Sequence, residues 1–343
     1  MMKNFFARNK KNTIFEVEPD ELGGFSDFTE KELFTQSTLA EDFTSRHIRL
    51  GKIRFDNIKI PFDKIKRIYI IGNGCDYACA LAAAYNAEVL CDIPSFAESI
   101  FEFTHSNPVL DKSTLVIIIT SDKESADCIN AVNRLKNSSA KIIFVFSSGV
   151  EMQNVISVGM TEKGELPCPS FLLKYLAISM LMVYIGDKNK VITELYKTIS
   201  LNAFSSISKR LDEVFGARDI IFQAAKRIDI NGLVISGINV DFAQSIYSAL
   251  IMSKATGEKI HPICVNMLSG YNNVLAITSC IELNKALMKE TTPDIAILPA
   301  NIEMHGITTI SYGETIPLLN PIISTAVIEL IAYYKLRKNN DEA

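Results

Sequence analysis

Short apolar runs rich in β-branched residues alternate with helical stretches along most of this chain, and this alternation constrains the fold more than any other feature. In the first half the runs cover 67–71, 115–120 and 141–146. They are continuously apolar, which indicates strands buried on both faces. Such strands, separated by helices, predict an α/β fold with a doubly wound parallel sheet flanked by helices.

The same pattern returns in the second half of the chain. Strands are expected at 232–237, 274–279 and 294–299, and helices at 191–215, 242–255 and 316–336. With 343 residues the chain is long enough for two domains. We expect an N-terminal arm and connector helix at 1–50, a first domain at 51–195, and a second domain with a C-terminal helix at 196–343. In the arm, Thr38 and Glu41 fit a capping box that starts a helix running to about Arg49.

Composition excludes several classes of protein. The net charge is −4, from 35 Lys and Arg against 39 Asp and Glu, so a dedicated nucleic-acid binder is not expected. The most apolar run, Tyr175–Gly186, is too short to span a membrane, and the N-terminus lacks the apolar core of a secretory signal. Seven cysteines form no CxxC pair, and four histidines show no metal-ligand spacing. We expect a cytoplasmic protein with free thiols, without metal, cofactor, membrane or nucleic-acid partner.

The first candidate site is the glycine-rich turn Gly72–Asp76, between a strand and a helix. Amide groups at a helix N-terminus bind anions, and glycine lets a ligand approach the backbone, so Gly74, Cys75 and Asp76 are candidate phosphate contacts. The alternative is a tight turn that only joins strand to helix. The turn is not a dinucleotide fingerprint, because Tyr77 stands where a third glycine is needed. Cys75 is also a weak nucleophile candidate, since a helix N-terminus lowers a thiol pKa.

The second candidate site is the stretch Thr120–Ser125, again between a strand and a helix. Its three hydroxyls, on Thr120, Ser121 and Ser125, are able to bind a phosphate or sugar oxygens. The alternative is a helix cap, because Ser121 and Glu124 fit a capping box. Both turns are expected at the carboxyl ends of parallel strands, where open α/β sheets bind ligands.

Five segments, taken in order, resemble the isomerase half of glutamine–fructose-6-phosphate aminotransferase, which consists of two SIS (sugar isomerase) domains. GGFSDFTEKELFTQ is similar to the connector of that family, RIYIIGNGCDY to its first phosphate turn, and TSDKESAD to its serine-rich loop. SALIMSK and PIISTAVIELIAYYKLRK are similar to its later helices. The resemblance covers roughly residues 22 to 336 and implies two SIS domains, each a doubly wound parallel sheet.

The resemblance also implies a ligand, a partner and a missing part. The ligand is a sugar or sugar phosphate, and a homodimer is expected because family members pair through these domains. The glutaminase domain of the family is expected to be absent, because few residues precede the connector. The implied ligand-binding residues are Gly74, Cys75, Asp76, Thr120, Ser121, Asp122, Ser125 and Ser170.

This chain departs from the family at the residues that carry catalysis. The lysine and the proton-shuttling glutamate of the family fall on Ile251 and Lys254, and its ring-opening histidine falls on Gly270. A proton shuttle needs a group that can take and return a proton, and Lys254 is protonated unless it is strongly desolvated. The sequence therefore leaves no assigned catalytic residue, with Lys254 at the glutamate position.

The phosphate-binding serines are replaced as well, by Asp76 and Asp122. At about 4 Å one pair of unit charges costs ~1 to ~4 kcal/mol, so two carboxylates in the site would disfavour phosphorylated sugars. We expect a sugar-binding protein on a former isomerase scaffold. The alternatives are an active isomerase or deaminase of phosphosugars or amino sugars with altered catalytic residues, and a structural partner protein with a blocked pocket.

Overall fold

The apolar runs form the central strands of two parallel sheets in the computed structural model, which describes residues 22–121, 124–147, 152–160, 162–279, 285, 293–300, 302 and 307–342. The first sheet has the order β4-β3-β5-β6-β7. Its strands are β3 (Arg67–Gly72), β4 (Ser95–Ser99), β5 (Thr114–Thr120), β6 (Lys141–Phe146) and β7 (Val155–Ser157). The central strand β5 is buried along its whole length, as its continuous apolar run predicts.

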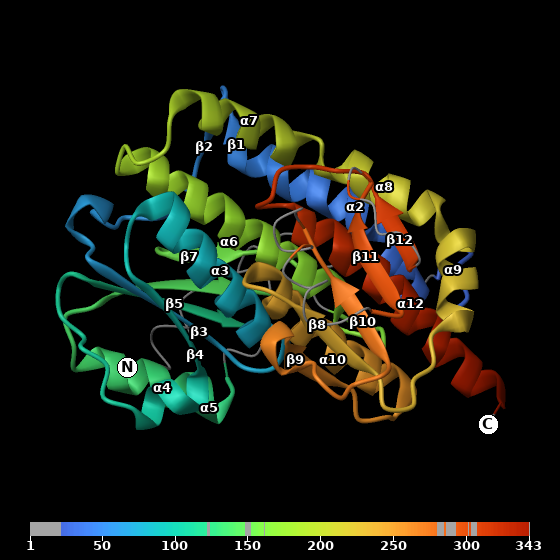
Figure 1. The fold of residues 1–343 in the computed structure, drawn as a ribbon. Helices are drawn as coiled ribbons and strands as arrows, with labels where there is room; N and C mark the ends of the chain where they lie inside the picture. Colours follow the sequence, from blue (N-terminus) through green and yellow to red (C-terminus); the bar gives the residue numbers. More distant parts are fainter. Residues whose placement is uncertain are drawn as a thin grey trace.

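Helices cover both faces of the first sheet (Figure 1). Alternate residues of each strand point to opposite faces, so Ile117 packs in one apolar cluster and Ile118 in another. The helices of this half are α3 (Cys75–Cys91), α4 (Ile100–His105), α5 (Ala126–Lys136) and α6 (Cys168–Lys188).

The second sheet repeats this design with the order β12-β11-β10-β8-β9. Its strands are β8 (Val234–Gly237), β9 (His261–Cys264), β10 (Val274–Ile277), β11 (Ile295–Pro299) and β12 (Thr308–Tyr312). The short 3₁₀ helix η2 (Val265–Met267) follows β9 directly. The helices are α10 (Val240–Thr256) and α12 (Asn320–Glu342). Within the described residues every strand pair of both sheets is parallel, which confirms the predicted α/β class with two doubly wound lobes.

The N-terminal helix α2 (Phe28–His47) begins well before the predicted capping box, so the start assigned to Thr38 is wrong. The cap is Asp27, whose side chain accepts a hydrogen bond from the Glu30 amide at 2.8 Å. Glu30 reaches back to the Ser26 amide at 2.6 Å. Asp27 and Glu30 thus form the box at the start of this helix, and Thr38 lies inside it. The short elements β1 (Ile48–Arg49), β2 (Lys52–Ile53) and η1 (Phe62–Lys64) follow.

The helical stretch predicted at 191–215 is divided into separate helices. The stretch contains α7 (Glu194–Ser205) and α8 (Ile207–Gly216), and α9 (Arg218–Arg227) follows beyond its predicted end. Ser206 and Ala217 interrupt the regular backbone, with φ and ψ of −104° and 4° at Ser206. The breaks let the segment bend around α2 and α12, against which α8 packs.

Two long apolar helices are buried inside the fold. Helix α6 is long and apolar enough to cross a membrane, but 94% of its most apolar window is buried in the protein, as in a core helix. Helix α12 packs against α10, α9 and α8. The aliphatic face of α12 is at most 1% exposed and packs inside the monomer: Ile322, Ile323, Ala326, Val327 and Leu330.

Candidate functional site

The glycine-rich turn joins β3 to α3 in a conformation that requires glycine. A Cβ atom on Gly72 would lie 2.5 Å from the Asp76 carbonyl oxygen, so no larger residue fits there. Gly74 has φ +56° and ψ −122°, a backbone conformation that favours glycine. The Asn73 side chain holds the turn in place, because its Nδ2 donates to Asp127 Oδ2 at 2.9 Å and its Oδ1 accepts from the Ile100 backbone amide at 3.0 Å. The turn is therefore rigidly placed at the carboxyl edge of the sheet.

A buried ion pair lies at this edge. The Lys174 ammonium donates to Asp76 Oδ1, and the two side chains are 2% and 12% exposed. The same ammonium donates to Ser121 Oγ at 2.7 Å, and Ser147 Oγ donates to Ser121 Oγ at 3.0 Å. The cluster thus joins the ends of β3, β5 and β6 to the core helix α6. Asp76 does not turn outward as a surface cap, and its charge is compensated within the protein.

Lys174 belongs to this candidate site and was not anticipated from the sequence. It stands alone in the apolar stretch Phe171–Val183 of α6, and a lone lysine in a buried helix is unusual unless it is paired. That isolation was an available signal for a buried ion pair, but the sequence does not identify the partner.

Glu162 and Ser170 lie beside this pair. The Ser170 amide donates to Glu162 Oε1 at 2.9 Å, and Ser170 is 2% exposed. Burial raises the pKa of Glu162, while Lys174 lowers it and Asp76 raises it through their charges. The Ser170 amide therefore orients the partly accessible carboxyl of Glu162 beside the ion pair.

Two other candidate ligand-binding residues lie apart from each other, one at the carboxyl end of β5 and one at the start of α5. Thr120 is buried at the end of β5. The Ser125 side chain accepts a hydrogen bond from the Cys128 amide at 3.3 Å and caps α5, so the expected Ser121–Glu124 box does not start this helix. Asp122 lies outside the described residues.

The two remaining candidates have definite environments. Burial raises the pKa of Cys75 to about 12, which disfavours the thiolate that a nucleophile needs. Lys254 is exposed on α10, which packs against α3, and its charge lowers the pKa of Cys75. Lys254 is therefore within electrostatic reach of the turn. Ile251 is 1% exposed and belongs to the core.

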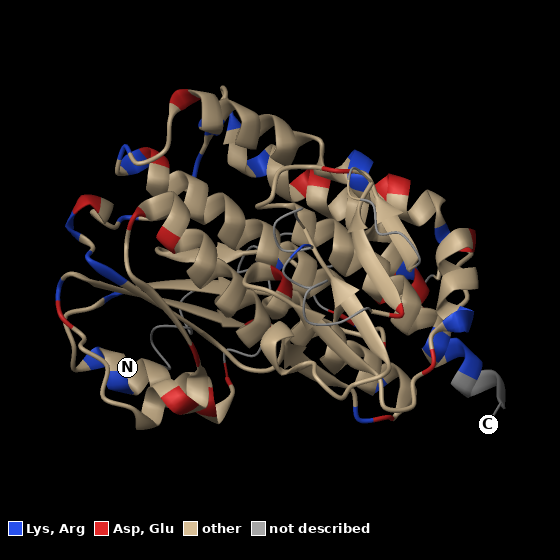
Figure 2. Cartoon of the chain, viewed as in Figure 1, with Lys and Arg blue, Asp and Glu red and all other residues tan. Residues whose placement is uncertain are grey.

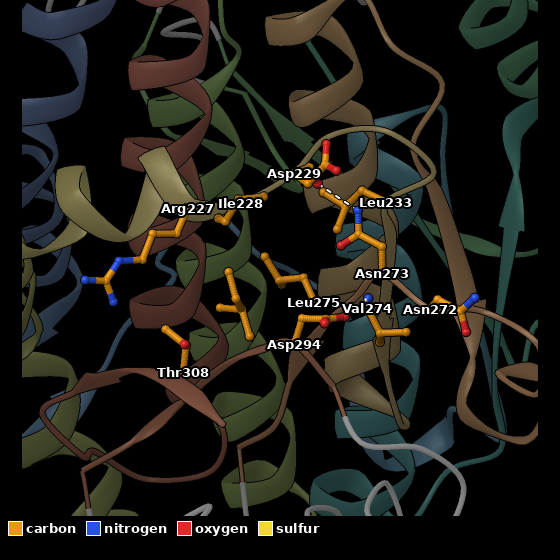
Figure 3. Close-up of a pocket in the computed structure, with 11 residues that line it drawn as sticks. Arg227, Ile228, Asp229, Leu233, Asn272, Asn273, Val274, Leu275, Asp294 and Thr308 are labelled. Atoms are coloured by element: carbon orange, nitrogen blue, oxygen red, sulfur yellow. Dashed lines mark hydrogen bonds between the residues drawn. The ribbon is translucent and has the colours of Figure 1, made fainter. Parts of the chain in front are cut away.

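A separate pocket lies at the opposite, amino-terminal edge of the second sheet (Figure 3). Its lining includes Asp229, Asn273 and Asp294, and the Arg227 side chain extends away from the two carboxylates. Asn273 donates to the Asp229 and Asn231 carbonyls at 2.8 and 3.0 Å, and Asp294 accepts from the Val274 amide at 2.9 Å. Because Asn273 and Asp294 are already hydrogen-bonded to backbone groups where the strands begin, this pocket is the weaker candidate for a ligand site.

Residues 62–153 match the SIS domain family model. Glutamine–fructose-6-phosphate aminotransferase of Clostridium tetani is 37% identical over 138 residues, 39% of this chain and 23% of that protein. The same enzyme of Caldanaerobacter subterraneus is 20% identical over 96% of this chain and 60% of its own length, and that of Clostridium acetobutylicum is 24% identical over 92% and 56%. The chain thus spans at most 60% of these relatives.

Solved structures share the fold over nearly the whole chain. The C-terminal domain of glucosamine-fructose-6-phosphate aminotransferase from Francisella tularensis superposes with a TM-score of 0.83, at 15% identity, over 92% of this chain and 98% of that one. Glucosamine-6-phosphate deaminase from Thermotoga maritima superposes with a TM-score of 0.64, at 16% identity, over 91% and 95%. The chain contains a SIS domain, and two SIS-like lobes make up its α/β fold.

Proposed function

We propose that the carboxyl edge of the first sheet binds a sugar derivative, phosphorylated hexoses included, without isomerising it. The observation that carries this proposal is the buried Asp76–Lys174 ion pair with Ser121 beside it. It provides a fixed, charge-compensated polar group at the edge where open α/β sheets bind ligands. The relatives named for phosphosugars support the ligand class.

The ion pair changes the expected preference for phosphate. An uncompensated Asp76 would repel a phosphate by ~1 to ~4 kcal/mol at about 4 Å. The Lys174 ammonium, in direct contact with that carboxylate, offsets a repulsion of the same order. Lys254 and the N-terminus of α3 add an attraction of about 0.3–1 kcal/mol each when exposed. Phosphorylated sugars therefore remain acceptable ligands.

The same geometry argues against isomerase chemistry of the usual kind. A proton shuttle must exchange its proton freely with the substrate, and Asp76 is held by Lys174. The resemblance places Lys254 where the family has its glutamate. Binding without turnover is the function that these residues support best.

Glu162 favours a second candidate function, that of an active isomerase or deaminase with altered residues. Its carboxyl is partly accessible, and burial raises its pKa, which brings a carboxyl closer to the range of a general base. In that case Glu162 would supply the proton transfer from a position different from the glutamate of the family.

Calorimetry and a product assay distinguish the two. Wild-type protein is titrated with fructose-6-phosphate, glucosamine-6-phosphate and glucosamine, and each mixture is followed by NMR for conversion. We expect binding without conversion, and no glucosamine-6-phosphate from fructose-6-phosphate and glutamine. Lys254→Ala should weaken phosphosugar binding about two- to fivefold, as expected for one exposed charge, and leave glucosamine unchanged.

Lys209→Ala on α8, which changes an exposed lysine of a helix that packs against α2, is the matched control and should bind like wild type. Conversion that Glu162→Gln abolishes would establish the second candidate function instead. Failure of all three sugars to bind at millimolar concentration would refute the proposed site.

A further inference from the structure

The two lobes contain the same strand–turn–helix geometry. Gly237 ends β8 as Gly72 ends β3, and a Cβ atom on Gly237 would lie 2.5 Å from backbone atoms of Asp241. Asn239 has φ 54° and ψ −119°, nearly the values of Gly74. Asp241 therefore occupies in the first turn of α10 the position that Asp76 occupies in α3.

The two equivalent carboxylates differ in how their charge is compensated. Asp76 contacts the Lys174 ammonium, as described above. Asp241 is 0% exposed, and its Oδ2 accepts from the Ser279 amide at 2.9 Å and from Ser279 Oγ at 3.1 Å. Its Oδ1 has no hydrogen-bond partner in the described part of the chain. A buried carboxylate is strongly unfavourable unless a positive charge or hydrogen-bond donors compensate it.

Two further buried side chains at this edge each carry one polar atom without a hydrogen-bond partner among the described residues. Gln244 is one turn further along α10 and 1% exposed; its Oε1 accepts from Thr325 Oγ1, whereas its Nε2 has no partner among the described residues. Tyr312 ends β12 and is 4% exposed, and its hydroxyl likewise has no partner within the described ranges. Burial, and then the charges of Asp241 and of the exposed Glu314, raise the pKa of Tyr312, so the phenol lies within electrostatic reach of the Asp241 carboxylate.

We propose that Asp241, Gln244 and Tyr312 bind a small monovalent cation at the carboxyl edge of the second sheet. The three groups offer a carboxylate oxygen, a phenol oxygen and an amide, and oxygen donors suit hard cations. The Thr325 hydroxyl either donates or accepts, so the Gln244 amide is able to turn its oxygen toward the site. The cation takes the place that the Lys174 ammonium fills in the first lobe.

The charge of the site selects a monovalent ion. One carboxylate balances one positive charge, whereas Ca²⁺ is usually bound by several carboxylates. Within the described residues no group of three or more His, Cys, Asp or Glu gathers to bind a divalent metal. Burial raises the pKa of Asp241 to about 7, so above that pH the carboxylate is charged and needs its counter-ion. The site lies in the other lobe from the sugar site and does not depend on the function proposed there.

Thermal unfolding in different chloride salts tests the proposal. The wild-type protein is heated at about pH 8 and ~0.15 M ionic strength, with choline replaced stepwise by K⁺, Na⁺ or NH₄⁺. We expect at least one of these ions to raise Tm by ~2–4 °C, with saturation, because a ligand that binds only the folded state stabilises it. Asp241→Asn should abolish the response, and Tyr312→Phe should shift its midpoint several-fold to higher cation concentration.

Asp212→Asn, which changes an exposed carboxylate on α8, is the control and should keep the full response. If Asp241→Asn does not fold, the wild-type titration and Tyr312→Phe still decide. A wild-type Tm that is the same in choline, K⁺, Na⁺ and NH₄⁺ would overturn the proposal and leave Asp241 compensated by its own proton or by water. A cation response that Asp241→Asn retains would overturn it as well.

Discussion

Removing the Lys174 ammonium should destabilise the protein strongly, although the residue lies in an apolar helix. Lys174→Met keeps a long unbranched side chain but leaves Asp76 as a buried carboxylate without its partner, and removes one of the two donors to Ser121 Oγ. The side chains of the pair are only 2% and 12% exposed, so solvent screens the lost interaction weakly. Breaking a buried pair by removing one partner costs about 3–5 kcal/mol, a large part of a typical folding stability of about 5–15 kcal/mol.

Urea unfolding followed by far-UV circular dichroism measures this loss, since the chain has no tryptophan for fluorescence. The double variant Asp76→Asn with Lys174→Met should recover most of the stability and lie within about 1–2 kcal/mol of wild type, because neither charge of the pair then remains. The matched control is Arg49→Met, which breaks the exposed Arg49–Asp56 pair and should cost at most about 1 kcal/mol. A Lys174→Met loss no larger than that of the control would refute the reasoning, as would a double variant that loses the sum of both single changes.

Three further predictions concern the turns, the interior and the assembly. Gly72→Ala and Gly237→Ala should each lower Tm measurably, because the added Cβ would lie 2.5 Å from backbone atoms, whereas Gly216→Ala meets nothing within 4 Å and should be neutral; equal Tm values would contradict this. Burial raises the pKa of Glu329 from 4.5 to about 8, so the folded state holds a proton that the unfolded state releases, and stability should fall as pH rises between these values by at most about 1.4 kcal/mol per pH unit. Glu329→Gln should remove that slope in urea titrations at several pH values, and an unchanged slope would exclude Glu329 as its source. A homodimer is expected in solution, and a light-scattering mass near 38.1 kDa at micromolar concentration would count against it.

The sequence alone determined the central strands and the turns that follow them. Strands β3, β5, β6, β8, β10 and β11 match apolar runs, because a strand buried on both faces must be apolar throughout. The glycine turn after β3 was equally readable, because its backbone conformation depends on local sterics at Gly72 and Gly74.

The strands β4, β7, β9 and β12 were not anticipated, and each lies at an edge of its sheet. An edge strand has one neighbour and more exposure, so it needs no continuous apolar run; β12, for example, alternates in part between exposed and buried residues. The helix breaks at Ser206 and Ala217 could not be predicted from the sequence either. Both residues are compatible with a helix, and the bend follows from packing around α2 and α12.

Only the tertiary structure decided the chemistry of the site. Asp76 was readable as a carboxylate in a phosphate turn, but its partner Lys174 comes from a helix far along the chain, and packing of α6 against α3 brings the two together. Asp241 has the same local geometry and receives no such lysine among the described residues. Local sequence sets the backbone of both turns, whereas the charge beside each carboxylate depends on which distant side chain the fold places there.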